Sequence, residues 1–190
     1  MKPLVNRMDL LTGEVPSGAT VVIRRASDMK GLYQNRVALE GLIKAKDPVV
    51  YQVYNVAVPE RNGELQHCVS IIYPGKVGDE YFMTKGHFHA RRDTAEVYLG
   101  LRGKGKLLLQ TEKGEIEVLD MFPGSILYIP PYWGHRTVNV GDEPLIFFAI
   151  YPGDAGHDYQ TIEAHGFRKV IVERDGKPVL VDNPNYRPST

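Results

Sequence analysis

Two observations predict a mainly β protein, built as a sandwich or a barrel. From residue 51 onward the sequence consists of short apolar segments, several of them alternating with polar residues, and turn residues such as Asp175-Gly176 separate them. About ten such segments follow one another at the spacing typical of all-β domains. The expected strands are residues 51–58, 69–73, 95–101, 106–110, 116–119, 125–129, 136–140, 145–151, 170–174 and 178–181.

The N-terminal part of the chain has a different pattern. We expect a short strand at residues 20–24 and a helix at about residues 35–44, where apolar side chains form a partial stripe. The sequence therefore predicts a mixed N-terminal extension, residues 1–50, packed on a single barrel, residues 51–182. Residues 183–190 are expected to form a loosely held tail.

The composition excludes several classes of protein. Lys plus Arg and Asp plus Glu both number 23 in a chain of 190 residues, so no net charge favours nucleic acid as a partner. The longest apolar runs, such as residues 145–151, are too short to cross a membrane. Residues 1–11 lack the apolar stretch of a secretory signal, and the one cysteine, Cys68, cannot form an intrachain disulfide. We therefore expect a cytoplasmic enzyme or binding protein.

Three histidines and one glutamate form the most informative pattern. Strand alternation places His87 and His89 on one face, with Phe88 opposite, and Glu96 lies on the next apolar-rich strand. His135 follows a rigid Pro-rich turn that is able to aim it at the same point. Three imidazoles and one carboxylate suit Fe(II), Mn(II), Ni(II), Zn(II) or Co(II) better than Ca(II). The sequence therefore predicts a site for one divalent ion, and an octahedral ion there keeps two positions open for substrate.

These residues resemble the two sequence motifs of the cupin superfamily. In the first motif the matching residues are His87, His89, Glu96 and Gly103; in the second they are Gly124, Pro130, His135 and Asn139. Six residues separate His89 from Glu96 where the motif has three or four, Tyr81 stands at the leading Gly, and Tyr132 replaces a central Gly. The resemblance implies a cupin jelly-roll barrel, with the metal inside it and one or two small helices outside.

A closer resemblance is to the archaeal cupin-type glucose-6-phosphate isomerases, and it covers about residues 27–183. It rests on residues 84–89, 95–98, 130–139 and 150–159, and the last segment is the most specific because cupins in general lack it. The resemblance implies a metal-dependent aldose–ketose isomerase of glycolysis and gluconeogenesis. It also implies a phosphosugar substrate, one ion per subunit with Fe(II) expected, and a homodimer.

The reaction gives the site residues their expected roles. Aldose–ketose isomerisation through a cis-enediol moves one proton between C1 and C2, and the resemblance implies Glu96 as the proton shuttle as well as a ligand. Tyr98, on the same strand face, is expected to hydrogen-bond a substrate hydroxyl. The resemblance places Ser70, Thr84 and the backbone N–H of Gly86 near the sugar, His157 and Tyr159 at the phosphate end, and Tyr51 and Tyr151 in the pocket wall.

Several alternatives remain open at this point. A hydride shift between C1 and C2 needs no base for the carbon-bound hydrogen, and a metal-bound carboxylate is a weakened base. A cupin Fe(II) dioxygenase or a non-catalytic sugar-binding cupin would share the metal ligands. The strand face opposite the metal carries Val97, Leu99 and Leu101, which need cover from the N-terminal segment or from a second subunit.

Overall fold

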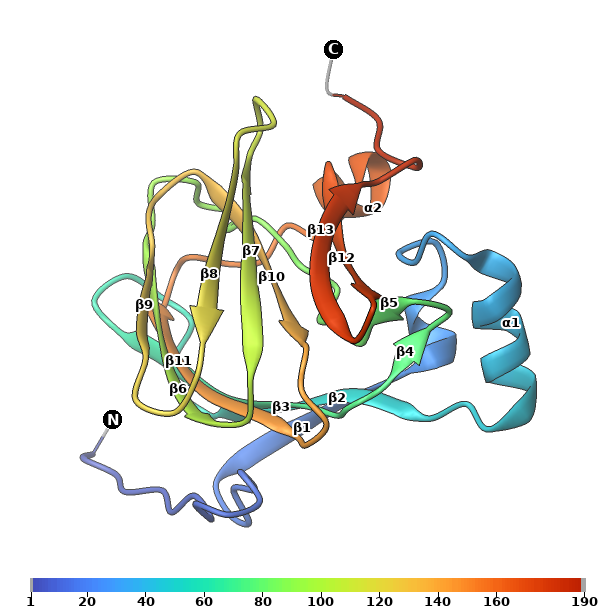
Figure 1. The fold of residues 1–190 in the computed structure, drawn as a ribbon. Helices are drawn as coiled ribbons and strands as arrows, with labels where there is room; N and C mark the ends of the chain where they lie inside the picture. The colour runs from blue at the N-terminus through green and yellow to red at the C-terminus, as the bar shows by residue number, and fades with distance from the viewer. Residues whose placement is uncertain (1, 189–190) are drawn as a thin grey trace.

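The computed structural model describes residues 2–188 and has the predicted mainly β architecture (Figure 1). The strands are β1 (Ala19–Arg25), β2 (Val49–Val56), β3 (Leu65–Ile72), β4 (Lys76–Val77), β5 (Glu80–Tyr81), β6 (Glu96–Arg102), β7 (Gly105–Thr111), β8 (Ile116–Met121), β9 (Ile126–Ile129), β10 (Trp133–Asn139), β11 (Leu145–Pro152), β12 (Lys169–Arg174) and β13 (Lys177–Asp182). The helices are the 3-10 turn η1 (Ala26–Met29), α1 (Arg36–Ala45) and α2 (Gln160–His165).

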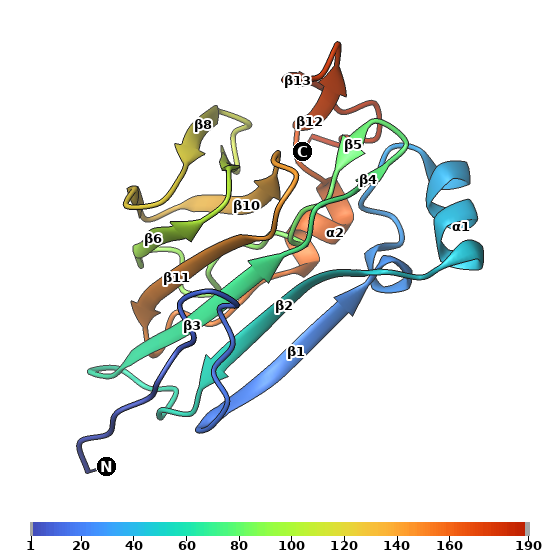
Figure 2. The same ribbon diagram turned by 60° about the horizontal axis from the view of Figure 1, so that its bottom comes forward.

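Two sheets face each other and enclose the core. One has six strands in the order β1-β2-β3-β11-β6-β9, and the other has three in the order β10-β7-β8. Figure 2 shows β1, β2, β3 and β11 side by side, with β8 and β10 on one side of that sheet. Buried side chains from both sheets, including Tyr98, Phe147, Leu107 and Val138, belong to one hydrophobic cluster. A third sheet, with four strands in the order β13-β12-β5-β4, adds Tyr81 and Ile171 to the same cluster. The predicted cupin-type barrel is therefore confirmed.

The predicted strands and the predicted helix all occur, with small differences at their ends. The expected strand at residues 51–58 is β2, which begins at Val49 and ends at Val56. Helix α1 begins after Asn35, whose side chain accepts a hydrogen bond of 2.9 Å from the Ala38 N–H. The two-residue strands β4 and β5 and the six-residue helix α2 were not predicted, because such short elements show no periodicity. Across residues 2–188 neither helix has the length and apolar character that a membrane span requires.

The N-terminal segment contributes to the barrel in two ways. Strand β1 pairs with β2 and so extends the six-stranded sheet. Before it, Val15 packs on the outer face of this sheet against Val69 and Ile146. Gly13 has a φ of +76°, and a Cβ there would lie 2.7 Å from Ile146, so the close approach requires glycine.

Candidate metal centre

The structure brings the four predicted ligand side chains together. The ligand atoms of His87, His89, Glu96 and His135 all lie within 4.8 Å of one another. Glu96 begins β6 in the six-stranded sheet and His135 belongs to β10 in the opposite sheet, so the group lies between the two sheets. His87 is held against β10, because His87 and His135 exchange backbone hydrogen bonds of 3.2 and 2.9 Å. We call these four residues the front cluster.

The long gap between His89 and Glu96 forms a turn that fixes His89. His89 Nδ1 lies 3.2 Å from the Thr94 carbonyl oxygen and 2.8 Å from Thr94 Oγ1. The Thr94 hydroxyl donates to the Arg91 carbonyl oxygen at 2.7 Å, so it accepts from the imidazole. The inserted residues therefore hold the ring with Nε2 toward the front cluster, and Glu96 keeps its place in β6 despite the unusual spacing.

The orientation of the imidazoles fits a cation. The Nδ1 atoms of His89 and His135 face the carbonyl oxygens of Thr94 and Trp133, so Nδ1 carries the proton and Nε2 has the free lone pair. These Nε2 atoms lie 3.1 and 3.0 Å from Glu96 Oε2, which is also an acceptor.

His87 Nε2 is buried and has no hydrogen-bond partner within residues 2–188. Facing lone pairs repel one another unless a cation lies between them. Ligand bonds of about 2.1 Å at right angles set neighbouring ligand atoms about 3 Å apart, which is close to the two distances to Glu96. The front cluster therefore fits one divalent ion.

The charge states of the front cluster are those of metal ligands. Burial disfavours the charge of Glu96, but positive charge at the adjacent His135 and His89 outweighs burial and holds its pKa at about 2, and a bound cation would supply that charge instead. Burial, together with the neighbouring histidines, keeps the pKa of His87 well below its usual value. At neutral pH the cluster thus offers a carboxylate to a metal. Burial, reinforced by Glu96, raises the pKa of Tyr98 far above its usual range, so this phenol remains a hydrogen-bond donor.

A cavity of about 430 Å³ opens over the front cluster. A volume of this size is typical of small-molecule sites. All the predicted substrate and catalytic residues outside the metal ligands line it: Tyr51, Ser70, Thr84, Gly86, Tyr98, Tyr151, His157 and Tyr159. Arg24 and Lys85 also line it, and the sequence interpretation missed both. Arg24 reaches the cavity from β1, and only the long-range pairing of β1 with β2 brings it there.

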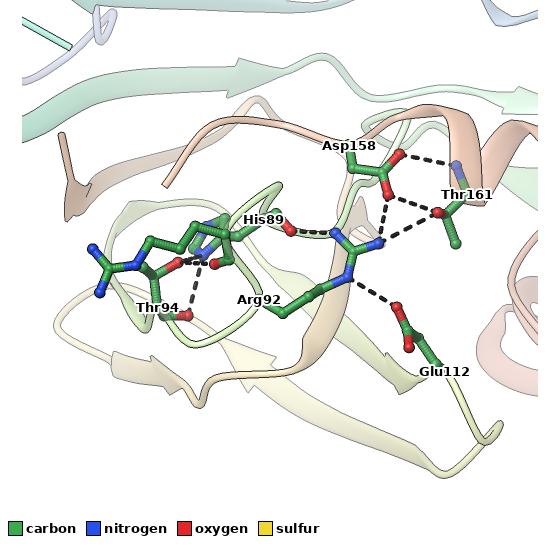
Figure 3. A network of polar contacts seen from close by, with 7 residues as sticks. His89, Arg92, Thr94, Glu112, Asp158 and Thr161 are labelled. Atoms are coloured by element: carbon green, nitrogen blue, oxygen red, sulfur yellow. Dashed lines mark hydrogen bonds and ion pairs between the residues drawn. The ribbon is translucent and has the colours of Figure 1, made fainter. Parts of the chain in front are cut away.

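Two contacts join the segment before α2 to the loop that carries the histidines. Phe88 and Asp158 exchange backbone hydrogen bonds of 3.1 and 2.8 Å. The Arg92 side chain donates to the His89 carbonyl oxygen and, at 2.5 Å, to Asp158 Oδ2 (Figure 3). Arg92 also donates to Glu112 Oε1 at 2.9 Å.

As a result, the rings of the predicted phosphate-end residues lie beside the front cluster. The His157 ring centroid is 4.5 Å from that of His87 and 5.4 Å from that of Tyr151. Tyr159 stacks on His157 at 5.8 Å and lies 5.4 Å from His87. One substrate molecule in the cavity is therefore able to contact this pair and the metal ligands together.

Two facing sheets around a His/Glu cluster define a cupin-type barrel with a divalent-metal site. Sequence comparison then gives the family: the model described as Glucose-6-phosphate isomerase (GPI) matches residues 23–188, and the chain belongs to this family. The predicted family and enzyme class are confirmed.

The relatives are similar over almost their whole length. The chain is 52% identical to a glucose-6-phosphate isomerase of Pyrococcus abyssi over 186 residues, covering 98% of both chains. It is 50% identical to that of Thermococcus litoralis, covering 98% of this chain and 97% of the relative. A putative glucose-6-phosphate isomerase 1 of Rhizobium meliloti is 39% identical, with 98% and 88% covered.

Among solved structures, an oxalate decarboxylase of Bacillus subtilis described by its Mn(II) centres matches with a TM-score of 0.46 and 24% identity. That match covers 57% of this chain and 27% of the other. An oxalate decarboxylase of Lactobacillus farciminis in complex with formate matches with a TM-score of 0.46 and 21% identity, covering 57% and 30%.

Proposed function

We propose that this chain interconverts glucose 6-phosphate and fructose 6-phosphate in the cavity over the front cluster. The observation that carries the proposal is the cavity itself, in which the convergent His/Glu ligands and the hydroxyl and imidazole donors face one space. Similarity over almost the whole chain, at 50–52% identity, to relatives named glucose-6-phosphate isomerase supports the same activity.

His87, His89, Glu96 and His135 would hold one divalent ion per chain, and we propose Fe(II) as that ion. Mn(II), Ni(II), Zn(II) and Co(II) are compatible with the same donors. When bound, the ion would polarise the oxygens on C1 and C2 of the sugar and so make the carbon-bound hydrogen more acidic.

Glu96 is proposed to move the proton. Its Oε2 faces His89 and His135, whereas Oε1 has no hydrogen-bond partner within residues 2–188, and the residue lines the cavity. One oxygen is therefore available to take the proton from C2 and return it to C1 of the cis-enediol, while the other stays with the ligand set. Tyr98, held as a neutral phenol, donates a hydrogen bond to a substrate oxygen.

The remaining cavity residues are proposed to bind the phosphosugar. Ser70, Thr84 and the Gly86 N–H are placed at the sugar, and Tyr51 and Tyr151 form the wall. His157 and Tyr159 are assigned to the phosphate end. We add Arg24 to this end, because arginine binds phosphate oxygens with paired, charge-assisted hydrogen bonds and Arg24 lines the same cavity.

We also propose a homodimer with a cytoplasmic location. An apolar outer face lies on the adjacent strands β3, β11, β6 and β9. It is formed by side chains that are each 37–75% exposed: Leu65, Val97, Ile126, Tyr128 and Ile150. A second copy is proposed to cover this face. Ile126→Lys is then expected to yield monomers in sedimentation analysis, and an unchanged sedimentation coefficient would contradict this interface.

The function is tested by loading chelator-treated protein separately with Fe(II), Mn(II), Ni(II), Zn(II) and Co(II). Glucose 6-phosphate is added without air, and fructose 6-phosphate is followed by a coupled assay. We expect product with at least one ion and none without metal. No product with any ion would overturn the proposal. Oxygen uptake with an organic acid would instead indicate a dioxygenase, and sugar binding without turnover would indicate a non-catalytic cupin.

A further inference from the structure

A β-bulge lies at the edge of the cavity, between the loop that carries the histidines and β10. The Thr84 N–H donates to the Thr137 carbonyl oxygen at 2.9 Å, and the Thr137 N–H donates to Thr84 Oγ1 at 3.1 Å. The next pair is His87 with His135. Two residues on the loop thus lie opposite one residue on β10. Bulges of this kind commonly redirect groups next to active sites.

The two bulged residues are Lys85 and Gly86, and the bulge frees the N–H of Gly86. Gly86 lines the cavity, and its N–H has no hydrogen-bond partner within residues 2–188. Its φ is +76°, and a Cβ there would lie 2.7 Å from the Phe167 ring and 3.0 Å from the His135 carbonyl oxygen. Only glycine therefore permits this conformation and this close approach.

The single residue opposite the bulge is Arg136, which lies behind the cavity. His135 lines the cavity over the front cluster, which we call the front cavity, whereas Arg136 lines a separate cavity of about 310 Å³. Successive residues of a strand point to opposite faces, so this arrangement is expected. Arg136 is only 2% exposed, and its guanidinium carbon lies 4.5 Å from the centroid of the Phe167 ring. Its Nε and Nη2 donate to the Lys85 carbonyl oxygen at 3.2 and 2.7 Å. Within residues 2–188, no carboxylate lies within 4.0 Å of this guanidinium.

A buried cation without an ion-pair partner is costly, so packing alone does not account for Arg136. Its contact with Lys85 has a consequence for the cavity. The Lys85 carbonyl and the Gly86 N–H belong to one trans peptide, so they point in opposite directions. The guanidinium holds the carbonyl on the rear side, and this directs the N–H to the front. The positive charge also polarises the peptide and strengthens the N–H as a donor.

We propose that Arg136 is a positioning residue for substrate: it holds the Lys85–Gly86 peptide so that the Gly86 N–H donates to an oxygen of the phosphosugar. Arg136 does not touch the substrate itself. The inference rests on the proposed function only in taking the front cavity as the phosphosugar site.

The test compares Arg136→Met and Arg136→Lys with the matched control Arg102→Met. Met keeps an unbranched apolar stem but removes the charge and both hydrogen bonds, and Lys keeps a charge with a less rigid donor. Arg102 also donates to a backbone carbonyl, that of Leu11 at 2.8 Å, and pairs with Glu143, but it does not line the cavity. Each protein is loaded with Zn(II), and its metal content and thermal unfolding are measured first.

Binding is then measured by calorimetry with 6-phosphogluconate, whose C1 carboxylate prevents isomerisation. We expect Arg136→Met to keep its ion and its fold, and to bind this probe about 3- to 10-fold more weakly, the range for one hydrogen bond to a neutral sugar oxygen. In Arg136→Met, KM for glucose 6-phosphate should rise by a similar factor, while kcat changes less than about threefold. The affinity and KM of Arg136→Lys should lie between those of Arg136→Met and the unmodified protein. Arg102→Met should match the unmodified protein.

Unchanged affinity in Arg136→Met would overturn the proposal. A loss of affinity that follows a loss of metal or of thermal stability would also overturn it, because Arg136 would then be only structural. If Arg136→Met does not fold, the proposal is tested by the affinity of Arg136→Lys for the probe and by the amide NMR signal of Gly86. That signal must shift when the probe binds to the unmodified Zn(II) protein, and an unshifted signal contradicts the proposal. If the unmodified protein binds the probe but turns over no glucose 6-phosphate, the proposed function fails and this inference stands.

Discussion

Two clusters of buried polar side chains lie on opposite sides of β10, and they differ in how their charges are balanced by their neighbours. Glu96 in the front cluster is 4% exposed, yet positive charge at its histidine neighbours, for which a bound cation can substitute, outweighs burial and holds its pKa at about 2. On the rear side the buried residues Tyr33, Glu80 and Arg136 act on one another electrostatically, and we call them the rear cluster. There burial raises the pKa of Glu80 to about 7, although the Gln34 N–H donates to its Oε2 at 2.9 Å.

The difference shows what each cluster is suited to do. Glu80 Oε1 and the Tyr33 hydroxyl are buried without hydrogen-bond partners within residues 2–188. The front cluster combines a stable carboxylate with imidazole lone pairs and therefore needs a cation. The rear cluster already contains one in Arg136, and its carboxyl group is partly protonated near neutral pH. Four substitutions test this contrast, and they follow in decreasing order of effect.

The largest effect is expected for His135→Ala, which removes a ligand from the front cluster. The loss of the ion should lower turnover of glucose 6-phosphate by at least about a thousandfold, because the metal supplies several kcal/mol of stabilisation. Metal content is measured by mass spectrometry beside the rate. His67→Ala, on the outer face of β3, is the control and should retain both. A His135→Ala protein that remained active and metal-free would refute the role of the cluster.

Glu96→Gln is expected to have the next largest effect. The amide keeps the shape but removes the base, so kcat should fall about 10²- to 10⁴-fold in protein that still contains metal. Full activity with metal retained would remove Glu96 from proton transfer. Isomerisation in D₂O complements this test: proton transfer through Glu96 should introduce deuterium into the product, whereas a hydride shift between C1 and C2 should introduce none.

Glu80→Gln tests the rear cluster through stability. A carboxyl group with a pKa of about 7 in the folded chain and about 4.5 in the unfolded chain binds more protons when folded. Its contribution to stability is therefore present below pH 4.5 and is lost as the pH rises to 7, by about 3 kcal/mol.

Urea unfolding at pH 5 and pH 8 checks this expectation. The glutamine variant should lose less stability than the unmodified protein between the two values and should be more stable at pH 8. Glu117→Gln, at an exposed position of β8, should follow the unmodified protein. If Glu80→Gln showed the same pH dependence as its control, the pKa of Glu80 would not be raised.

The smallest effect is expected for His157→Ala. Loss of one donor at the proposed phosphate end should raise KM about tenfold, with the ion retained. His165→Ala, a histidine at the end of α2 that bonds to the Arg187 carbonyl oxygen, is the comparison and should leave KM unchanged. An unchanged KM in His157→Ala would contradict the phosphate assignment.

The front cluster was predictable from the sequence, and the rear cluster was not. His87 and His89 share a face through simple alternation, and motif resemblance adds Glu96 and His135 despite the longer spacing. Glu80 belongs to a strand of two residues and Tyr33 to no helix or strand, so no periodicity brings either to Arg136. Such contacts depend on long-range packing, which local pattern does not encode. Arg24 was missed for the same reason, although its strand was predicted.

One ion in the front cluster is proposed to support isomerisation. The most direct measurement titrates chelator-treated protein with Fe(II) without air, and records bound metal and the rate of fructose 6-phosphate formation at each addition. Bound metal and rate should rise together and reach their plateau at one ion per chain. Full activity before any metal is added, or a plateau of activity at a different stoichiometry from that of the site, would contradict this proposal.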